Sequence, residues 1–175
     1  MENDIKKGVV LTRDNPFFST LYLEKDGLIE ERRIMSRGKA SEPVSAKYAH
    51  ALLPRERLSP KGAQEIFYSG EIRLSRLPEL EVWMTNFVLR DHRKMTAEGR
   101  VQLRFLEFGN ETISDCSYHV WKVRVTTIMI NGAPVIFDQY YAPDLNLVLR
   151  SVKMTEGGSP ISEVRFDRAE IRSKL

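Results

Sequence analysis

The second half of the chain alternates between short strand-like segments and turn signals, and this pattern limits the fold more than any other feature. Trp121, Val123 and Val125 alternate with polar residues, which is the period-two pattern of a strand with one apolar face. Asn131-Gly132 then predicts a tight hairpin. We therefore predict an antiparallel meander over residues 80–166. Its six segments are residues 80–89, 100–108, 118–130, 135–141, 147–154 and 161–166.

The N-terminal region also has the composition of strands. Residues 8–37 are rich in aromatic and β-branched side chains, with polar and apolar residues alternating along 17–24. Lys25-Asp26-Gly27 interrupts this region, and Gly27 can adopt the positive φ that a hairpin turn needs. We predict N-terminal strands over residues 8–37, joined by a turn at Gly27. The pattern is weaker in the return segment, where Glu30-Glu31-Arg32-Arg33 also suits a helix.

The best candidates for helices lie in residues 40–67. Ser41 suits an N-cap, and Pro43 suits the first turn, where its missing N–H costs nothing. An apolar stripe at helical spacing follows and consists of Val44, Tyr48 and Leu52. Pro54 would end this helix, and Ser59-Pro60 predicts the start of a second one. We expect this helical segment to lie over the sheet.

These regions together predict one domain over residues 1–175. A chain of 175 residues corresponds to about one domain. A long antiparallel sheet must close, curl or be covered, because free strand edges favour aggregation. The predicted fold is therefore mainly β: a curved antiparallel meander, as a half-barrel or a barrel, with one or two short helices covering it.

Charge and motif searches favour a protein without catalytic chemistry. The 27 Lys and Arg against 24 Asp and Glu give a net charge of +3, and both signs are interspersed. This mixture is typical of a solvated surface, so we expect no specific nucleic-acid partner. The three histidines match no metal motif, and no phosphate loop or nucleophile elbow occurs. We predict no enzymatic activity, no cofactor and no metal, and we interpret the single Cys116 as a small core residue.

Hydropathy gives no sign of a membrane segment. No stretch approaches the ~20 apolar residues of a spanning helix, and the first 30 residues contain no run of signal-peptide length. A single cysteine fits a reducing compartment and equally a bacterial envelope protein without disulfides. We expect a soluble chain, periplasmic or in the cell envelope if a signal peptide has been removed, and otherwise cytoplasmic.

Two motifs in the meander resemble a known pattern. Cys116-x-Tyr118-x-Val120-Trp121-x-Val123 is followed, after a hairpin, by Tyr140-Tyr141-Ala142-Pro143-Asp144-Leu145-x-Leu147-Val148-Leu149-Arg150-Ser151. With Phe67-Tyr68-Ser69-Gly70 and the leucines at 74 and 77, the resemblance covers about residues 67–151. The pattern is similar to that of uncharacterised bacterial envelope (periplasmic) proteins with curved β-sheets, loosely similar to lipoprotein-carrier half-barrels. This resemblance implies an exported curved-sheet fold and carries no catalytic residues.

The aromatic side chains of the strands are the candidates for a ligand site. They can fill a core, which is the preferred interpretation, or line a cavity. We expect Trp121, which is also a candidate ligand contact, to be buried against the helical segment. If the concave side holds a ligand, its polar contacts come from Tyr140, Tyr141 and Arg150, since tyrosine combines an apolar body with a polar tip and arginine binds carboxylate or phosphate. The alternative is a hairpin that packs on itself, with Arg150 bridging surface carboxylates.

The leading functional hypothesis is a non-catalytic bacterial envelope protein that binds an apolar ligand or a protein partner. Its expected partners are a lipophilic small molecule or an envelope protein. The first alternative is a cytosolic interaction module that uses a basic surface. A hydrolytic enzyme ranks third.

Overall fold

The computed structural model describes residues 4–36, 45–59, 62–91 and 94–172. Two short helices and thirteen strands occur in these residues. The helices are α1 (Asp4–Lys7) and α2 (Leu77–Leu80). The strands are β1 (Val9–Asp14), β2 (Phe17–Lys25), β3 (Leu28–Ser36), β4 (Ser45–His50), β5 (Leu53–Ser59), β6 (Gly62–Tyr68), β7 (Val82–Asp91), β8 (Lys94–Ile113), β9 (Cys116–Met129), β10 (Val135–Ala142), β11 (Leu147–Met154), β12 (Pro160–Arg165) and β13 (Arg168–Ile171).

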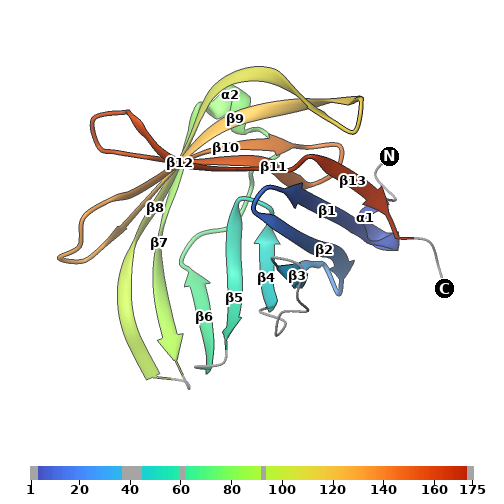
Figure 1. Ribbon diagram of the computed structural model, residues 1–175. Coiled ribbons are helices and arrows are strands. Elements are labelled where there is room, and N and C mark those ends of the chain that lie inside the picture. The colour runs from blue at the N-terminus through green and yellow to red at the C-terminus, as the bar shows by residue number, and fades with distance from the viewer. Residues whose placement is uncertain (1–3, 37–44, 60–61, 92–93, 173–175) are drawn as a thin grey trace.

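All thirteen strands belong to one antiparallel sheet that curves strongly without closing (Figure 1). Strands β1 to β12 follow one another as a meander, and β13 returns to pair with β1. Only Phe166 and Asp167 separate β12 from β13, although these strands form the two edges of the sheet. The backbone N–H of Asp167 donates to Thr12 O at 2.8 Å, which ties this corner to β1. The mainly β, curved antiparallel fold predicted from the sequence is confirmed.

Turn chemistry accounts for one predicted hairpin fully and for another in part. Asp26 and Gly27 have φ values of 52° and 74°, so a two-residue turn joins β2 to β3 as the glycine predicts. Asn131 also takes a positive φ of 63°, but Gly132 does not, and the β9–β10 connection is longer than a tight hairpin. Pro134 follows in this connection and has no N–H for the ladder, so pairing starts only at Val135.

The predicted helical segment at residues 40–67 is wrong. Its described residues form β4, β5 and β6, which carry the sheet from β3 to β7. Pairing with neighbouring strands overrides the short helical spacing, and Lys47 and Glu56 form a 2.8 Å ion pair across β4 and β5. Pro54 lies within β5 beside register shifts, where a missing N–H is tolerated. Ser41, Pro43, Val44 and Pro60 lie outside the described residues.

No helical lid therefore covers the sheet in the part of the chain that the structure describes. Each of the two described helices has four residues. In α2, Pro78 occupies the first turn, and the buried Leu77 anchors the helix to the main apolar cluster. Neither described helix is long or apolar enough to cross a membrane.

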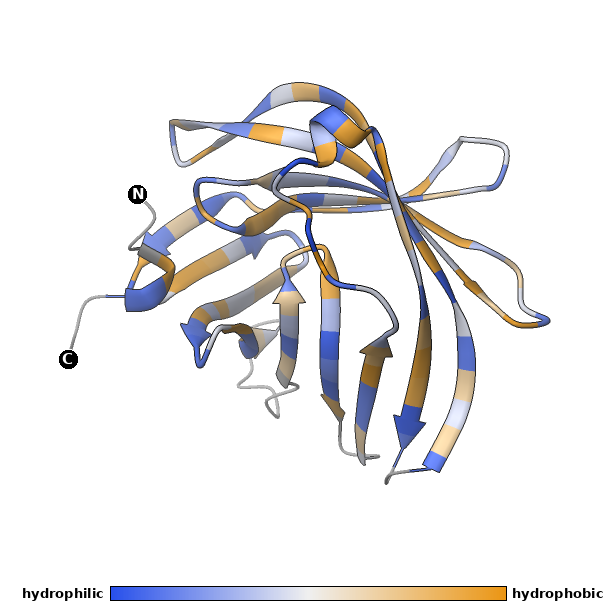
Figure 2. Cartoon of the chain, turned by 180° about the vertical axis from the view of Figure 1, so that it is seen from behind, coloured by the Kyte–Doolittle hydropathy of each residue, from blue (hydrophilic) through white to orange (hydrophobic). Residues whose placement is uncertain are grey.

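Two apolar clusters hold the curved sheet together. Hydrophobic and hydrophilic residues alternate along the strands, as the orange and blue bands of Figure 2 show. The first cluster joins the inner residues of β5–β9, such as Leu53, Leu103 and Val123. The second joins the N-terminal strands to β11 and to the far end of the β8–β9 hairpin, through Leu11, Leu149 and Ile113.

Candidate functional site

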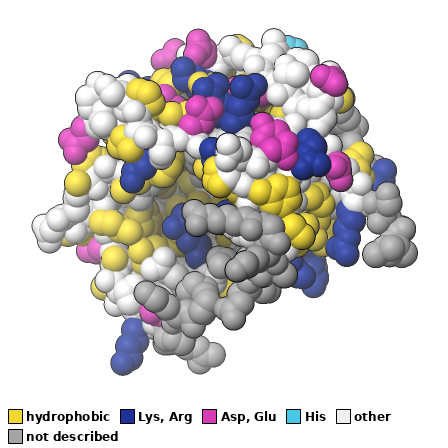
Figure 3. Space-filling view, viewed as in Figure 1, with side chains coloured by type: hydrophobic (Ala, Val, Ile, Leu, Met, Phe, Trp, Pro, Cys, Tyr) yellow, Lys and Arg dark blue, Asp and Glu magenta, His cyan; other side chains and the backbone are white. Residues whose placement is uncertain are grey.

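The concave side of the sheet contains two adjoining cavities. Cavity A has a volume of about 470 Å³ and lies among residues of β2, β3, β10 and β11. Cavity B has a volume of about 450 Å³ and lies among residues of β5–β11. Figure 3 shows hydrophobic side chains gathered in the recess of this face, with basic side chains beside them. Gln139 and Ser151 line both cavities, so the two volumes meet at these residues.

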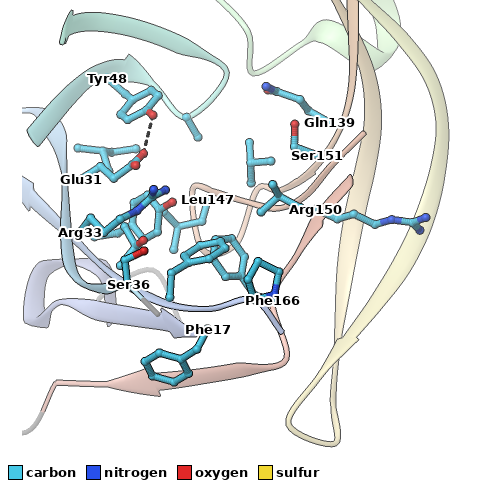
Figure 4. A pocket seen from close by; sticks show the side chains of 18 residues that line it. Phe17, Glu31, Arg33, Ser36, Tyr48, Gln139, Leu147, Arg150, Ser151 and Phe166 are labelled. Carbon is cyan, nitrogen blue, oxygen red and sulfur yellow. Dashed lines mark hydrogen bonds between the residues drawn. The ribbon is translucent and has the colours of Figure 1, made fainter. Parts of the chain in front are cut away.

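Cavity A combines an apolar wall with a half-buried Tyr48–Glu31 pair and the exposed Arg33 (Figure 4). Tyr48 Oη donates a 2.5 Å hydrogen bond to Glu31 Oε2. Burial, followed by the nearby Glu31 carboxylate, raises the pKa of Tyr48 well above its ordinary value, so the phenol stays protonated. The guanidinium of Arg33 lies 4.8 Å from the centre of the Phe18 ring. This end of the concave face can therefore bind a polar or anionic group beside an apolar chain.

Cavity B is more apolar. Its wall includes the buried side chains of Leu53, Phe87, Leu89, Val101 and Val125. Besides Gln139 and Ser151, its polar side chains are Arg57, Gln64 and Thr127, and Tyr68 also lines it. The Tyr68 hydroxyl is already used, since it donates to Pro54 O at 2.7 Å. Cavity B therefore suits a hydrocarbon segment with a charged contact at Arg57.

The polar pair where the cavities meet comes from neighbouring strands. Gln139 of β10 lies directly opposite Ser151 of β11, and Val123 of β9 lies on its other side. Figure 4 shows Gln139 and Ser151 directed into the cavity. Gln139 Oε1 is buried and has no hydrogen-bond partner among the described residues. The cavities thus share one polar position, formed by side chains of two neighbouring strands.

Two of the sequence-predicted site residues, Trp121 and Tyr141, lie together at one end of the concave face. Their rings meet edge to face at 5.6 Å, and the ring of His50 lies 4.9 Å from Tyr141. Tyr141 Oη donates to Asn146 Oδ1 at 3.2 Å. Burial, followed by Asp144, raises the pKa of Tyr141 to about 12. Trp121 is half-buried rather than buried as predicted, because it lines a more polar hollow of about 820 Å³.

This polar hollow, here called the rim pocket, is bordered by charged residues of both signs: Lys6, Glu24, Arg73 and Asp144. His50 Nδ1 accepts a 3.2 Å hydrogen bond from the backbone N–H of Leu52. Burial lowers the pKa of His50 to about 4, so the imidazole is neutral at pH 7. Its position fixes the turn between β4 and β5 beside Tyr141.

The other two predicted residues, Tyr140 and Arg150, contact each other on the opposite face of the sheet. The Arg150 guanidinium lies 4.6 Å from the centre of the Tyr140 ring. Its Nη1 lies 3.2 Å from Glu111 Oε1, and its Nε lies 2.7 Å from Glu163 Oε1 as an ion pair rather than an aligned hydrogen bond. Arg150 borders cavity A, but Figure 4 shows its guanidinium pointing away from the cavity. The structure therefore divides the four predicted residues between two places.

Sequence reasoning missed the residues that give the cavities their polarity: Glu31, Arg33, Tyr48, Arg57, Gln139 and Ser151. One signal for Gln139 was present, because it interrupts an alternating apolar face between Phe137 and Tyr141. Cys116 was also misplaced: it is exposed at the start of β9 and not in the core. No group of metal-ligating side chains occurs within the described ranges.

Comparison with known proteins supports the fold. A solved structure, the hypothetical lipoprotein YmcC from Escherichia coli K12, matches with a TM-score of 0.54 and 13% sequence identity. The match covers 99% of this chain and 90% of that chain. No protein-family model and no curated protein sequence matches the chain. The loose structural similarity to an envelope protein expected from the sequence motifs is thus confirmed at the level of the fold.

Proposed function

We propose that this chain is a non-catalytic binding protein of the bacterial cell envelope that holds one elongated, mostly apolar ligand in cavities A and B. The observation that carries the proposal is the pair of cavities, about 470 and 450 Å³, which share Gln139 and Ser151. Volumes of roughly 300–1,000 Å³ with apolar walls and a few polar groups are typical of small-molecule sites. A filled core would leave no such space.

The charged residues favour an amphiphile over a pure hydrocarbon. Arg33 lines cavity A, and Arg57 lines cavity B. Both arginines are exposed to solvent at the cavity walls, and a guanidinium binds a carboxylate or phosphate with two parallel hydrogen bonds. We therefore infer a ligand with an acyl chain and an anionic end.

The envelope location rests on fold and motif likeness. The sequence motifs resemble those of envelope proteins, and YmcC, whose fold is similar, is described as a hypothetical lipoprotein. Binding without a chemical step fits the polar groups of cavity A. Because burial raises the pKa of Tyr48, its phenol acts as a hydrogen-bond donor to Glu31 and not as a base.

Displacement of a fluorescent probe tests the proposal. N-phenyl-1-naphthylamine fluoresces in apolar surroundings, and stearate should displace it if both occupy the cavities. Thr127 lines cavity B, whereas Thr126 precedes it on β9 and projects from the opposite face. We expect Thr127→Phe to fill the cavity and weaken probe and stearate binding at least tenfold, while the matched Thr126→Phe binds as wild type.

Two results would overturn the proposal. The first is stearate binding that is equal in both threonine variants, which would place the site elsewhere. The second is the absence of any displacement by stearate or by a lysophospholipid in the folded wild-type protein. That second result would favour the protein-partner hypothesis.

A further inference from the structure

The polar pair at the junction of the cavities points to a more specific ligand. Gln139 and Ser151 are cross-strand partners on the concave face. Along β10 the neighbouring positions on that face are Phe137 and Tyr141, and the partner on β9 is Val123. The pair is therefore surrounded by apolar side chains and does not belong to a larger polar network of the wall.

Gln139 contrasts with polar side chains of the sheet that are fully buried and paired. Its Oε1 has no hydrogen-bond partner among the described residues. By contrast, the hydroxyls of Thr12 and Ser19 lie 2.9 Å apart, and the buried Asp138 accepts two hydrogen bonds from Arg124. An acceptor that is buried without a partner destabilises the fold, so native proteins satisfy nearly all of them.

A bound ligand can supply the missing donor. Gln139 projects into the cavity in Figure 4, and a half-turn about its last side-chain bond exchanges the amide nitrogen and oxygen. The carboxamide can then accept one hydrogen bond and donate another, and the Ser151 hydroxyl can add a third. A hydroxyl or an amide group on the ligand matches this arrangement, whereas a plain methylene chain leaves it unsatisfied.

The position of Gln139 and Ser151 shows that they would not bind the charged end of the ligand. Among the described residues, Gln139 and Ser151 line both cavities, whereas Arg33 lines only cavity A and Arg57 only cavity B. An anionic end held by either arginine would leave the chain of the ligand to cross the junction. The polar group that meets Gln139 therefore lies within the chain.

We propose that the ligand is an acyl chain that carries a hydrogen-bond donor within the chain, a hydroxyl or an amide N–H, and that Gln139 and Ser151 select for it. This inference rests on the proposed function and names the ligand class for the same cavities. The donor forms its hydrogen bond to Gln139 Oε1, while the hydrocarbon on either side occupies cavities A and B.

Competition among matched acyl chains tests this selectivity. Stearate, 3-hydroxystearate and 12-hydroxystearate differ only in a hydroxyl and its position, and N-palmitoylglycine carries an amide instead. Each is titrated against N-phenyl-1-naphthylamine bound to the wild-type protein. We expect at least one donor-bearing chain to bind roughly tenfold more tightly than stearate, as one additional satisfied hydrogen bond predicts.

The variant Gln139→Leu should abolish this preference without weakening stearate binding. Gln102→Leu is the matched control, because Gln102 lies on β8 between Val101 and Leu103 of the inner face and projects to the other side. It should keep the wild-type preference. Ser151→Ala provides a second test with a smaller change in volume and should reduce the preference.

The outcomes separate this inference from the proposed function. If stearate and all donor-bearing chains bind wild type equally, or if Gln139→Leu keeps the preference, the inference is wrong. The proposed function, binding of an apolar chain in the cavities, then still holds. If neither stearate nor any other chain displaces the probe, both are wrong. A preference that Gln139→Leu removes and Gln102→Leu retains supports both.

Discussion

Polar side chains on the two faces of β10 and β11 differ in whether they have partners within the protein. On the outer face, Asp138 is paired with Arg124, and Arg150 contacts both Tyr140 and Glu111. The far part of the β8–β9 hairpin supplies Glu111 and arches over these strands (Figure 1). On the inner face, Gln139 faces a cavity with an oxygen that lacks a hydrogen-bond partner in the described part of the chain. The charged residues of these strands therefore stabilise the fold, whereas the carboxamide of Gln139 remains available for a ligand.

The largest expected effect comes from removing Arg150 from the ion pairs of the outer face. Arg150→Ala leaves the Glu111 carboxylate buried, and among the described residues Arg165 remains as its ion-pair partner at 3.4 Å. We expect a loss of about 3 kcal/mol in the free energy of unfolding, because a buried carboxylate that loses its nearer cation is costly. Urea denaturation measures this loss. Affinity for N-phenyl-1-naphthylamine should not change, and a stable variant that no longer binds the probe would instead give Arg150 a ligand-binding role.

The next effect concerns pH at the rim pocket. The pKa of His50 is lowered to about 4 in the folded protein, against about 6.5 in the unfolded chain. The unfolded state therefore binds the proton more readily, so this stability is present above pH 6.5 and is lost as the pH falls toward 4. Between pH 7 and 4.5 the loss from His50 should be roughly 2 kcal/mol.

Thermal or urea unfolding at both pH values checks this expectation. His50→Gln retains an acceptor for the Leu52 N–H but cannot be protonated in this range. Its stability should fall less than that of wild type on acidification. Parallel pH profiles for the two proteins would show that His50 is not the titrating group.

The smallest expected effect concerns the stability of variants at Gln139 on the inner face. In the absence of ligand, Gln139→Leu should stabilise the protein by about 1 kcal/mol, since it removes a buried acceptor that has no partner within the described ranges. Gln102→Leu, on the outer side of β8, should change stability by less than ~0.5 kcal/mol. Urea midpoints of the two variants give this difference. Marked destabilisation by Gln139→Leu would mean that the amide already has a partner in the folded protein.

Much of the sheet was predictable from local signals. The alternation along β9 and the Asp26-Gly27 turn define strands and a hairpin through steric preferences that act within a few residues. Residues 45–59 were not predictable in this way. Tyr48 and Leu52 have helical spacing, yet they belong to short strands and the turn between them, and the ladder with β3 decides the conformation.

The site was harder to predict than the fold. Alternation implies that Tyr140 and Tyr141 project to opposite faces, but it does not say which face becomes concave. The pairing of Gln139 with Ser151 also depends on the strand register, which shifts between Tyr140 and Tyr141 without a glycine or other local signal. Curvature and register are properties of the whole sheet, so the cavities emerge only in three dimensions.

If an acyl chain lies against the concave face, the position of bound stearate shows it most directly. Isotope-filtered NMR can detect contacts between unlabelled stearate and labelled methyl groups of the protein. We predict intermolecular NOEs to Leu89, Val101 and Val125, which line cavity B. NOEs confined to exposed apolar residues such as Ile161 and Ile171, with none to the cavity methyls, would contradict the account.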